Sequence, residues 1–573
     1  MEVSGASRPS ALGRRKFLQF SAVAAAGLPL LLEACGSGAA APSGAASGSA
    51  APPSAASGAK LQLPTFVPFK GAAPDFPGSA DGVVLPGYLT YPKNQPQTVP
   101  RPFGKGETVT IMTETSQAPP TPVGQNAAWQ AVNKATGVSL NLSPVSLADY
   151  QVKLNTVIAG GASGLADLLS IGSGSGLSNL PELLSSLFQD LTPYLGGDAV
   201  KAYPNLASFP TYAWRNCVFN NKIYCVPSVL SGITGPVMFA HGTQTDTVGG
   251  IQFKDTSDFM RAMKSLTKPG QRWGMTVTAG QTNGVSNAAL WFTQIFGAPN
   301  NWRESGGKLT KDWETAEFKA AIAFTRQLWE AGVITPASTH QGVIEASGEF
   351  YSGKAGLWQN GWVIGDLVWN HANGTTPNFN LQAVIPFSPD GGKTKPGNFL
   401  GSGAFFLTVL KKAPEAQIKL GLEVLNWLAA PFGTREYLLK MYGVEGTDFK
   451  FDTKHNPILT KRGLAENVGS SLRDLIGPPN VMYDANSEEY AKVMYPAQKT
   501  LQKMGIQNPV VGLYSATYAA KGTVLNQKMG DGLNNIVYGR AAMSAYDQLV
   551  KDWRTGGGDQ IRTEYEQALQ ASH

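Results

Sequence analysis

Leu165-Ala166-Asp167-Leu168-Leu169-Ser170-Ile171 is the stretch that decides the fold. A short, mostly apolar run of this kind is typical of a β-strand that is buried on both faces of a sheet. A helix is expected just before it, over 150–158, because the apolar residues there share one helical face and Gly160-Gly161 ends the pattern. A helix followed by a buried strand indicates an α/β architecture.

The residues further upstream repeat this alternation. Val109-Thr110-Ile111-Met112 and Val138-Ser139-Leu140-Asn141-Leu142 alternate between apolar and polar residues at period two, as strands do. Between them, Asn126 is placed to cap a helix that ends at Gly137. Strands that alternate with helices predict an α/β sheet that is mostly parallel.

Length and composition indicate an exported globular protein with two cores. Without its leader and tether, described below, the chain has about 510 residues, more than one hydrophobic core normally serves, so two lobes are expected. Hydrophobic residues make up 42% and charged residues 15%, which suits a folded chain and not a disordered one. The net charge of +6 includes no dense run of Lys or Arg, and this argues against a nucleic-acid partner.

The amino terminus has the pattern of an export signal. Arg14-Arg15 precede about a dozen mostly apolar residues, fewer than the roughly 17–25 that span a bilayer. With Phe17-Leu18 they resemble a twin-arginine signal, although Gly13 stands where Ser or Thr is usual, and the general export route stays open. We expect residues 1–34 to be a removable signal peptide. The alternative is a cytoplasmic protein with an accidental apolar start.

The signal ends at a candidate lipid anchor. Leu32-Glu33-Ala34-Cys35 resembles a bacterial lipobox, in which cleavage leaves the cysteine as a lipidated amino terminus, although Glu33 replaces a small residue. Residues 36–59 are almost wholly Gly, Ala, Ser and Pro, so 35–60 should be a lipidated cysteine with a flexible tether that spans ~25–30 Å. Residues 61–105 contain nine prolines and should form an extended strap without helices.

Cys217 and Cys225 remain once Cys35 is assigned to the lipid. They flank 218–224, a stretch that predicts two short strands around an Asn-Asn turn. A three-residue loop at 220–222 would place the cysteines opposite each other, at a spacing that a disulfide closes, and we expect this bridge. A two-residue loop would instead put them on opposite faces and leave two buried thiols. No histidine lies near either cysteine, so no metal site is expected there.

The segment 150–171 resembles the first lobe of the bacterial extracellular solute-binding proteins of ABC transporters. Within these proteins it is most similar to the long lipoproteins assigned to carbohydrate uptake, a group that resembles family 1 of the solute-binding proteins. The resemblance runs from about residue 62 to the end of the chain. Further matching stretches lie at 190–194, 221–227, 328–334, 350–356 and 442–446.

This resemblance implies a periplasmic-binding-protein-like fold of type II, in which two α/β lobes joined by crossover strands surround a ligand cleft. The chain would cross between the lobes near 228–240, return near 395 and cross again near 455. Lobe 1 would then comprise 106–232 and 395–455, and lobe 2 would comprise 233–394 and 456–573.

A Gly/Ser-rich loop, Gly172-Ser173-Gly174-Ser175-Gly176, follows the buried strand. At the carboxyl end of a strand it would lie at the edge of the sheet where α/β proteins bind ligands. We expect Ser173 and Gly174 to contact the ligand, because free N–H groups and hydroxyls there could hold sugar hydroxyls or an anion. An ordinary connection is the alternative. The G-x-G-x-G spacing without a following lysine argues against a dinucleotide or nucleotide site.

Tryptophans supply the positive signal for a sugar ligand. Trp358-Gln359-Asn360-Gly361-Trp362 resembles the segment where sugar-binding relatives place a stacking tryptophan. A flat ring offers an apolar face to a sugar ring while nearby amides bind its hydroxyls. We therefore expect Trp358 and Trp362 to bind the ligand, together with Trp291, Asn126 and Trp129. The alternative for each tryptophan is packing in the core.

Signatures of catalysis are scarce. The five histidines are isolated, and neither H-E-x-x-H nor G-x-S-x-G occurs. Ser265-Leu266-Thr267-Lys268 matches the S-x-x-K of penicillin-recognising enzymes but lacks their companion motifs. A glycosidase needs only two carboxylates at the right separation, which a sequence does not exclude.

The resemblance therefore implies a binding protein, not an enzyme, with neither cofactor nor metal. It would be a monomer held by its lipid anchor on the extracellular face of the cell membrane, or in the periplasm of a two-membraned host. There it would capture a mono- or oligosaccharide and deliver it to an ABC permease. The alternatives are a secreted glycoside-active enzyme and a surface adhesion lipoprotein.

Overall fold

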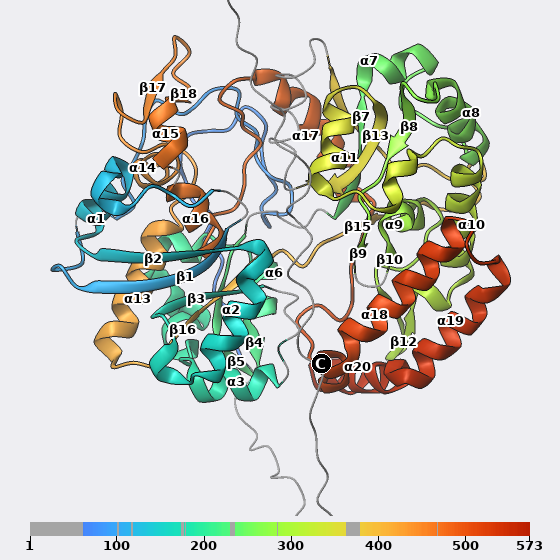
Figure 1. Cartoon of the computed structure of the whole chain (residues 1–573). Coiled ribbons are helices and arrows are strands. Elements are labelled where there is room, and N and C mark those ends of the chain that lie inside the picture. The colour runs from blue at the N-terminus through green and yellow to red at the C-terminus, as the bar shows by residue number, and fades with distance from the viewer. Residues whose placement is uncertain are drawn as a thin grey trace, which may run out of the picture. The chain divides into compact units, whose positions relative to one another are not determined.

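Figure 1 shows the computed structural model of the chain. The predicted signal peptide, Cys35 and the tether lie outside the described residues. In the part of the chain that is described, no helix is long and apolar enough to cross a membrane. The described residues belong to one compact unit, Lys60–His573, and are 61–99, 102–115, 118–172, 177, 179–229, 235–282, 285–362, 379–466 and 468–572.

The stretch that decides the fold forms β3 (Leu168–Gly172), the middle strand of a five-stranded sheet with the order β2-β1-β3-β16-β6. β3 is parallel to β1 (Thr108–Thr115), which is parallel to β2 (Ser139–Ser146). β16 (Phe406–Leu410) comes from much later in the sequence and runs antiparallel to β3 and to β6 (Cys225–Pro227). The predicted α/β sheet, with a strand buried on both faces, is confirmed. The prediction that it is mostly parallel is wrong, because the two pairings of β16 are antiparallel.

Helices pack on this sheet and complete lobe 1. Leu154, Leu184 and Leu422 each come from a different helix and are fully buried in one core with the strands. The helices are α1 (Ala127–Thr136), α2 (Leu147–Ala159), α3 (Leu180–Leu187), α4 (Thr192–Leu195), α5 (Pro204–Ala207), α6 (Thr211–Trp214), α13 (Glu415–Leu428), α14 (Arg435–Tyr442), α15 (Lys461–Glu466) and α16 (Val468–Leu475).

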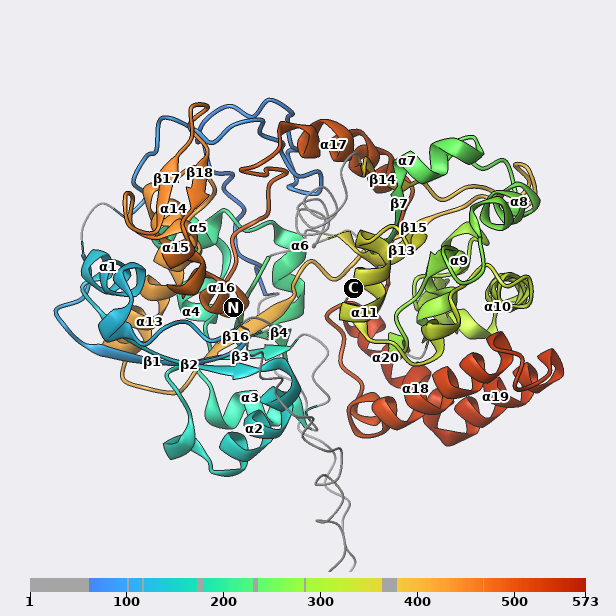
Figure 2. The ribbon, with the colours of Figure 1, turned by 45° about the horizontal axis from the view of Figure 1, so that its top comes forward.

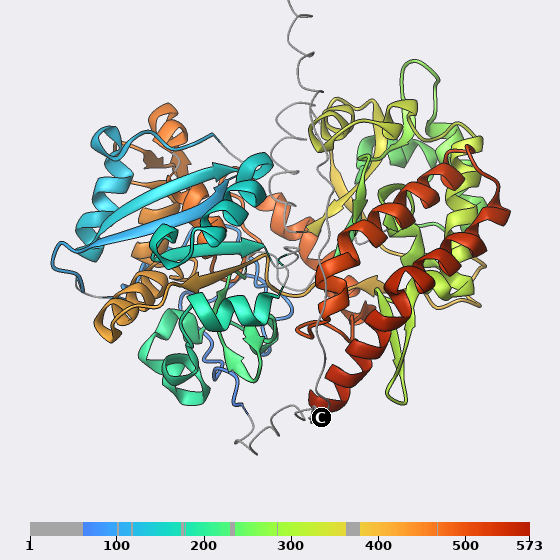
Figure 3. The ribbon, with the colours of Figure 1, turned by 60° about the horizontal axis from the view of Figure 1, so that its bottom comes forward.

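Lobe 2 is built on a second sheet with the order β14-β7-β13-β8. β13 (Ala355–Gly361) lies inside this sheet, antiparallel to β7 (Pro236–His241) and parallel to β8 (Trp273–Thr276), while β14 (Leu381–Val384) is the edge strand beside β7. Figure 3 shows the C-terminal helices, in red, lying together along this lobe. Its longer helices are α8 (Thr256–Leu266), α9 (Asn287–Ile295), α10 (Ala316–Glu330), α11 (Val343–Tyr351), α17 (Glu488–Lys503), α18 (Ala516–Val537), α19 (Tyr546–Trp553) and α20 (Asp559–Ser572).

The proline-rich segment lies across both lobes as an extended strap. The described residues of 61–105 form no helix, because proline removes backbone donors and fixes φ. On lobe 1 the backbone N–H of Thr65 donates to the carbonyl of Gly197 at 2.9 Å. Towards lobe 2, the ring of Phe76 stacks on Tyr495 of α17 at 5.0 Å. Tyr91, near the carboxyl end of the strap, is 1% exposed.

Three crossover segments join the lobes. The first runs between β6 and β7, and the third runs between α16 and α17. The second includes β15 (Asn398–Phe399), which pairs in parallel with β19 (Gly505–Ile506), the strand that follows α17. Two amide side chains of lobe 2 connect them. Gln294 donates to the carbonyl of Pro236 at 3.1 Å and accepts from the N–H of Phe399 at 2.6 Å. Asn300 donates to the carbonyls of Leu400 and Ile506, both at 2.8 Å.

The predicted third crossing, near 455, is wrong. α15 and α16 lie beside β1 and β3 in Figure 2, and α16 buries Val468, Leu472 and Leu475 in the core of lobe 1. These residues form an apolar stripe at helical spacing, and the sheet of lobe 1 covers it. The chain therefore leaves lobe 1 only after Ile476, so 456–476 belongs to lobe 1 and not to lobe 2.

The expected disulfide is also corrected, since Cys217 and Cys225 are free buried thiols in this structure. Strands β4 (Val218–Phe219) and β5 (Lys222–Ile223) pair with Val218 opposite Ile223, which leaves a two-residue turn. Both turn residues are asparagines in the left-handed region, with φ of 49° and 59°, as a type I′ turn requires. Cys217 is therefore in register with Tyr224, one residue short of Cys225.

Candidate ligand-binding site

A cavity of about 1300 Å³ is lined by both lobes and by the crossover segments. It opens at the carboxyl end of β3, where α/β sheets bind ligands. Ligand pockets commonly measure roughly 300–1000 Å³, so this one has room for several sugar rings. Representative lining residues are Gly172, Leu177, Asn216 and Phe219 from lobe 1, Gly235, Phe399 and Leu400 from the crossovers, and Asn301, Tyr518 and Asn526 from lobe 2.

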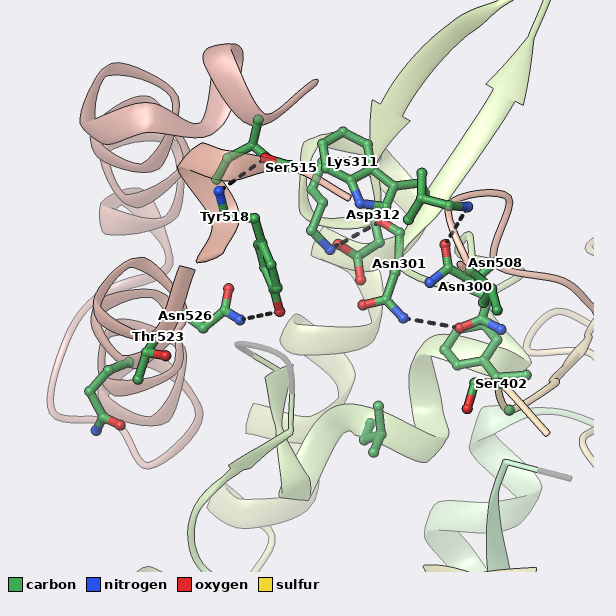
Figure 4. A pocket seen from close by; sticks show the side chains of 18 of the residues that line it. Asn300, Asn301, Lys311, Asp312, Ser402, Asn508, Ser515, Tyr518, Thr523 and Asn526 are labelled. Carbon is green, nitrogen blue, oxygen red and sulfur yellow. Dashed lines mark hydrogen bonds and ion pairs between the residues drawn. The ribbon is translucent and has the colours of Figure 1, made fainter. Parts of the chain in front are cut away.

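Amide side chains dominate the polar lining. On α18, Thr523, Asn526, Gln527 and Asn534 recur at helical spacing, so that one polar face of this helix points to the cavity. Figure 4 shows Thr523 and Asn526 on one side and Asn300, Asn301 and Ser402 on the other. An amide both donates and accepts hydrogen bonds, as a sugar hydroxyl does. The other amides of the lining are Asn216, Asn508 and Asn535.

Tyr518 presents an accessible aromatic ring to the cavity, in the first turn of α18, and is 39% exposed. Ser515 caps this helix by accepting a hydrogen bond from the N–H of Tyr518 at 2.9 Å, which fixes its backbone. The phenol oxygen accepts from Asn526 Nδ2 at 3.3 Å, which orients the side chain. The ring is therefore held in place, and part of its surface stays accessible to a ligand.

A buried ion pair fixes the opposite wall. Lys311 Nζ lies 2.5 Å from Asp312 Oδ1, 3.0 Å from the carbonyl of Asn301 and 3.7 Å from the centre of the Trp313 ring. Burial lowers the pKa of Lys311 and raises the pKa of Asp312, while each group's partner opposes the shift. The pair holds Asn301 in a left-handed turn, with φ of 61°. Asn301 Nδ2 in turn donates to Asn300 Oδ1 at 3.2 Å.

Residues 127–444 match the sequence profile of the family described as bacterial extracellular solute-binding protein. The chain belongs to this family. Two Bacillus subtilis proteins are similar along most of their length. The polygalacturonan/rhamnogalacturonan-binding protein YtcQ is 23% identical over 79% of this chain and 89% of its own, and lipoprotein LipO is 23% identical over 82% and 93%.

Solved structures confirm the type II periplasmic-binding-protein-like fold of this solute-binding protein. One is the HMO binding, ABC-transporter associated solute-binding protein of Bifidobacterium longum infantis, with a TM-score of 0.61 at 14% identity, covering 81% of this chain and 98% of that one. Another is FusA of Streptococcus pneumoniae in complex with kestose, with a TM-score of 0.60 at 16% identity, covering 81% and 99%.

The tryptophans expected at the ligand lie in the core of the solute-binding protein. Trp358 is 1% exposed and packs against Phe350 at 5.8 Å, and Trp362 is buried in the same cluster. Trp291 is buried against Phe259 and Phe292. None of the three lines the cavity. For Trp358 the reason is packing: side chains of α11 and α17 share its cluster and cover its face of the sheet.

Asn126 and Trp129 have structural roles as well. Asn126 is fully buried and caps α1, accepting from the N–H of Trp129 at 2.8 Å. The indole of Trp129 donates to the carbonyl of Leu140 at 3.2 Å. Neither residue lines the cavity, so their contact with a ligand stays a prediction. Ser173 and Gly174 lie outside the described residues, although Gly172 and Leu177 on either side line the cavity.

Sequence reasoning missed the polar face of α18. Its signal is present in the sequence, because Thr523, Asn526, Gln527 and Asn534 recur on one face of a helix. A polar helix face is ordinarily a solvated one, however, and nothing local shows that it borders a cavity. The described residues contain no cluster of three or more His, Cys, Asp and Glu side chains that could hold a metal ion.

Two carboxyl groups interact near the same edge of the lobe 1 sheet. Glu114 is the penultimate residue of β1, and Asp474 comes from α16, which packs on β1. Burial, together with Asp474, raises the pKa of Glu114 to about 7. Burial raises the pKa of Asp474 to about 6 against the opposing effect of Arg473. Both groups therefore take up protons more readily in the folded protein than in the unfolded one.

This pair predicts a pH-dependent stability. A carboxyl group whose pKa is raised by folding stabilises the folded state at pH values below its ordinary pKa. For Glu114 that stabilisation is lost as the pH rises through the folded-state pKa of about 7. Glu114→Gln should match the wild type at pH 5 and exceed its free energy of unfolding by about 1–2 kcal/mol at pH 8, after allowance for solvent screening. Urea unfolding at both pH values measures this, with the exposed Glu345→Gln as control. An equal difference at both pH values would contradict the assignment.

Proposed function

We propose that this solute-binding protein captures a mono- or oligosaccharide in the cavity between its lobes and delivers it to an ABC permease. The observation that supports this most is the combination of lining amides with the accessible ring of Tyr518. Amides bind hydroxyls, and a ring face packs on the C–H face of a sugar. The names of the relatives support the same class of ligand, because they refer to polygalacturonan, HMO and kestose.

Ligand binding is proposed to select a closed arrangement of the lobes. The crossover segments are the natural hinge, and Asn300 connects them to the wall of the cavity through Asn301. A ligand that engages Tyr518 of lobe 2 and Asn216 of lobe 1 at once would contact both lobes. Binding and lobe position would then be coupled through the ligand.

Calorimetric titration against a panel of mono- and oligosaccharides tests the proposal. We expect one sugar per chain to bind and to raise the melting temperature, because a ligand that binds only the folded state stabilises it. If no sugar in the panel binds or shifts the melting temperature, the proposal is wrong.

Binding without turnover is expected in the same titration. A glycosidase places two carboxyl groups on either side of the scissile bond. The only carboxylates among the described lining residues are Asp312 and Asp531, and Asp312 is buried against Lys311. The bound sugar should therefore be recovered intact by mass spectrometry, and cleavage products would favour an enzyme instead.

The proposal places the protein on the outer face of the membrane, held by the lipid on Cys35. Residues 36–573 contain no other apolar stretch long enough to span a bilayer. Cys35→Ala should therefore leave export intact and move the protein from the membrane fraction to the medium, as fractionation and blotting would show. Continued retention of the variant in the membrane would contradict the lipid anchor.

A further inference from the structure

The charges that line the cavity are few and balanced. In the described part of the chain they are Lys311, Asp312, Asp531 and Arg540. Lys311 is engaged by Asp312, by the carbonyl of Asn301 and by the Trp313 ring, and is only 5% exposed. A ligand carboxylate could reach it only by breaking a buried ion pair, which is strongly unfavourable.

Arg540 is far from the polar centre of the cavity. It follows the carboxyl end of α18, while Tyr518 lies in the first turn of that helix. A helix of this length separates the two ends by about 30 Å. The guanidinium lies 5.7 Å from the ring centre of Tyr538, at that distant end. It therefore cannot neutralise an acid bound beside Tyr518 and Asn526.

Two carboxylates lie just behind one part of the lining. Tyr514 lines the cavity, and its pKa is raised by burial and by the neighbouring carboxylates Glu182 and Glu564. These two carboxylates disfavour an anion bound beside Tyr514.

We propose that the cavity binds neutral oligosaccharides and rejects those that carry carboxylates, such as uronic acids. This inference rests on the proposed function and narrows its ligand class. It separates this chain from the relative named for polygalacturonan, because the described lining beside Tyr518 and Asn526 offers no unpaired cation to a uronate.

Matched sugars that differ only in charge test the inference. Cellotriose, maltotriose and galactotriose would be titrated calorimetrically beside their C6-oxidised uronate forms, in 20 mM and in 500 mM NaCl. We expect at least one neutral trisaccharide to bind with little dependence on salt. Its uronate form should bind about tenfold more weakly or worse in low salt, and the difference should narrow in high salt because salt screens repulsion.

The outcomes separate the two proposals. Uronates that bind as tightly as the neutral forms would overturn the inference and leave sugar binding intact. Absence of binding by either form would contradict both.

A charge placed in the cavity gives a second test. Asn526→Lys should raise uronate affinity about tenfold or more in low salt, because its ammonium would stand beside Tyr518. Val524→Lys adds the same charge to the same helix at an exposed position outside the lining, and should change uronate affinity less than twofold. An equal gain in both variants, or no gain in Asn526→Lys, would contradict the inference.

Discussion

Trp358→Ala should lower the free energy of unfolding by about 3–5 kcal/mol and leave the sugar affinity of the folded protein almost unchanged. The ring is 1% exposed and packs against Phe350 and Tyr351, at 5.8 and 6.0 Å between ring centres. Its removal leaves a cavity inside the sheet of lobe 2, between β7 and β8.

Urea denaturation measures the stability of this variant, and calorimetric titration well below its unfolding transition measures the affinity. Trp291→Ala, which removes an equally buried ring from the other core cluster of lobe 2, should behave in the same way. A Trp358→Ala protein of normal stability that no longer binds sugar would contradict this result. That result would instead support the contact between Trp358 and the sugar that the sequence resemblance implied.

Tyr518→Ala should weaken sugar binding about 5- to 150-fold while the melting temperature of the empty protein barely moves. Stacking of a flat partner on an aromatic ring is worth roughly 1–3 kcal/mol for nucleic-acid bases, and we apply that scale to a sugar ring. Stability should change little because the side chain is 39% exposed, and its contacts are the hydrogen bond from Asn526 and the ring of Tyr565 at 6.3 Å.

Tyr518→Phe is the matched control for this ring. It keeps the stacking surface and loses only the oxygen that accepts from Asn526 Nδ2. Since one hydrogen bond contributes about 0.5–1.5 kcal/mol, its affinity should fall by no more than about tenfold. If Tyr518→Ala binds as tightly as the wild type, the ring does not contact the ligand and the site is misplaced.

The sequence predicts the architecture well where the signal is local. Leu168, Leu169 and Ile171 are apolar in a run too short for a helix, and they form the buried β3. The first two crossings follow from the resemblance and agree with the positions of β7 and β16. The third predicted crossing does not agree with the structure. The apolar stripe of α16 could cover either lobe, and only the tertiary structure shows that it packs on β1.

The site was harder to predict because ligand contact is not a local property. Trp358 and Tyr518 are both aromatic residues with amides nearby in the sequence. Trp358 is covered because side chains of α11 and α17 pack on its face of the sheet, and Tyr518 is open because the first turn of α18 borders the cavity. Neither neighbour can be read from the adjacent residues. The hairpin at Cys217 shows the same limit, since the two-residue turn offsets Cys217 and Cys225 by one residue, yet the packing keeps their buried thiols within hydrogen-bonding reach of each other.

The most direct test of the account is backbone hydrogen exchange, with and without the sugar that binds best. Backbone amide hydrogens at 518–527 in α18 and at 300–301 should exchange more slowly when the sugar is added, because these segments line the cavity from opposite walls. Exchange at 355–361 in β13 should stay the same, since this strand is already paired on both sides within its sheet. Protection confined to 355–362, with none in α18, would contradict the proposed site.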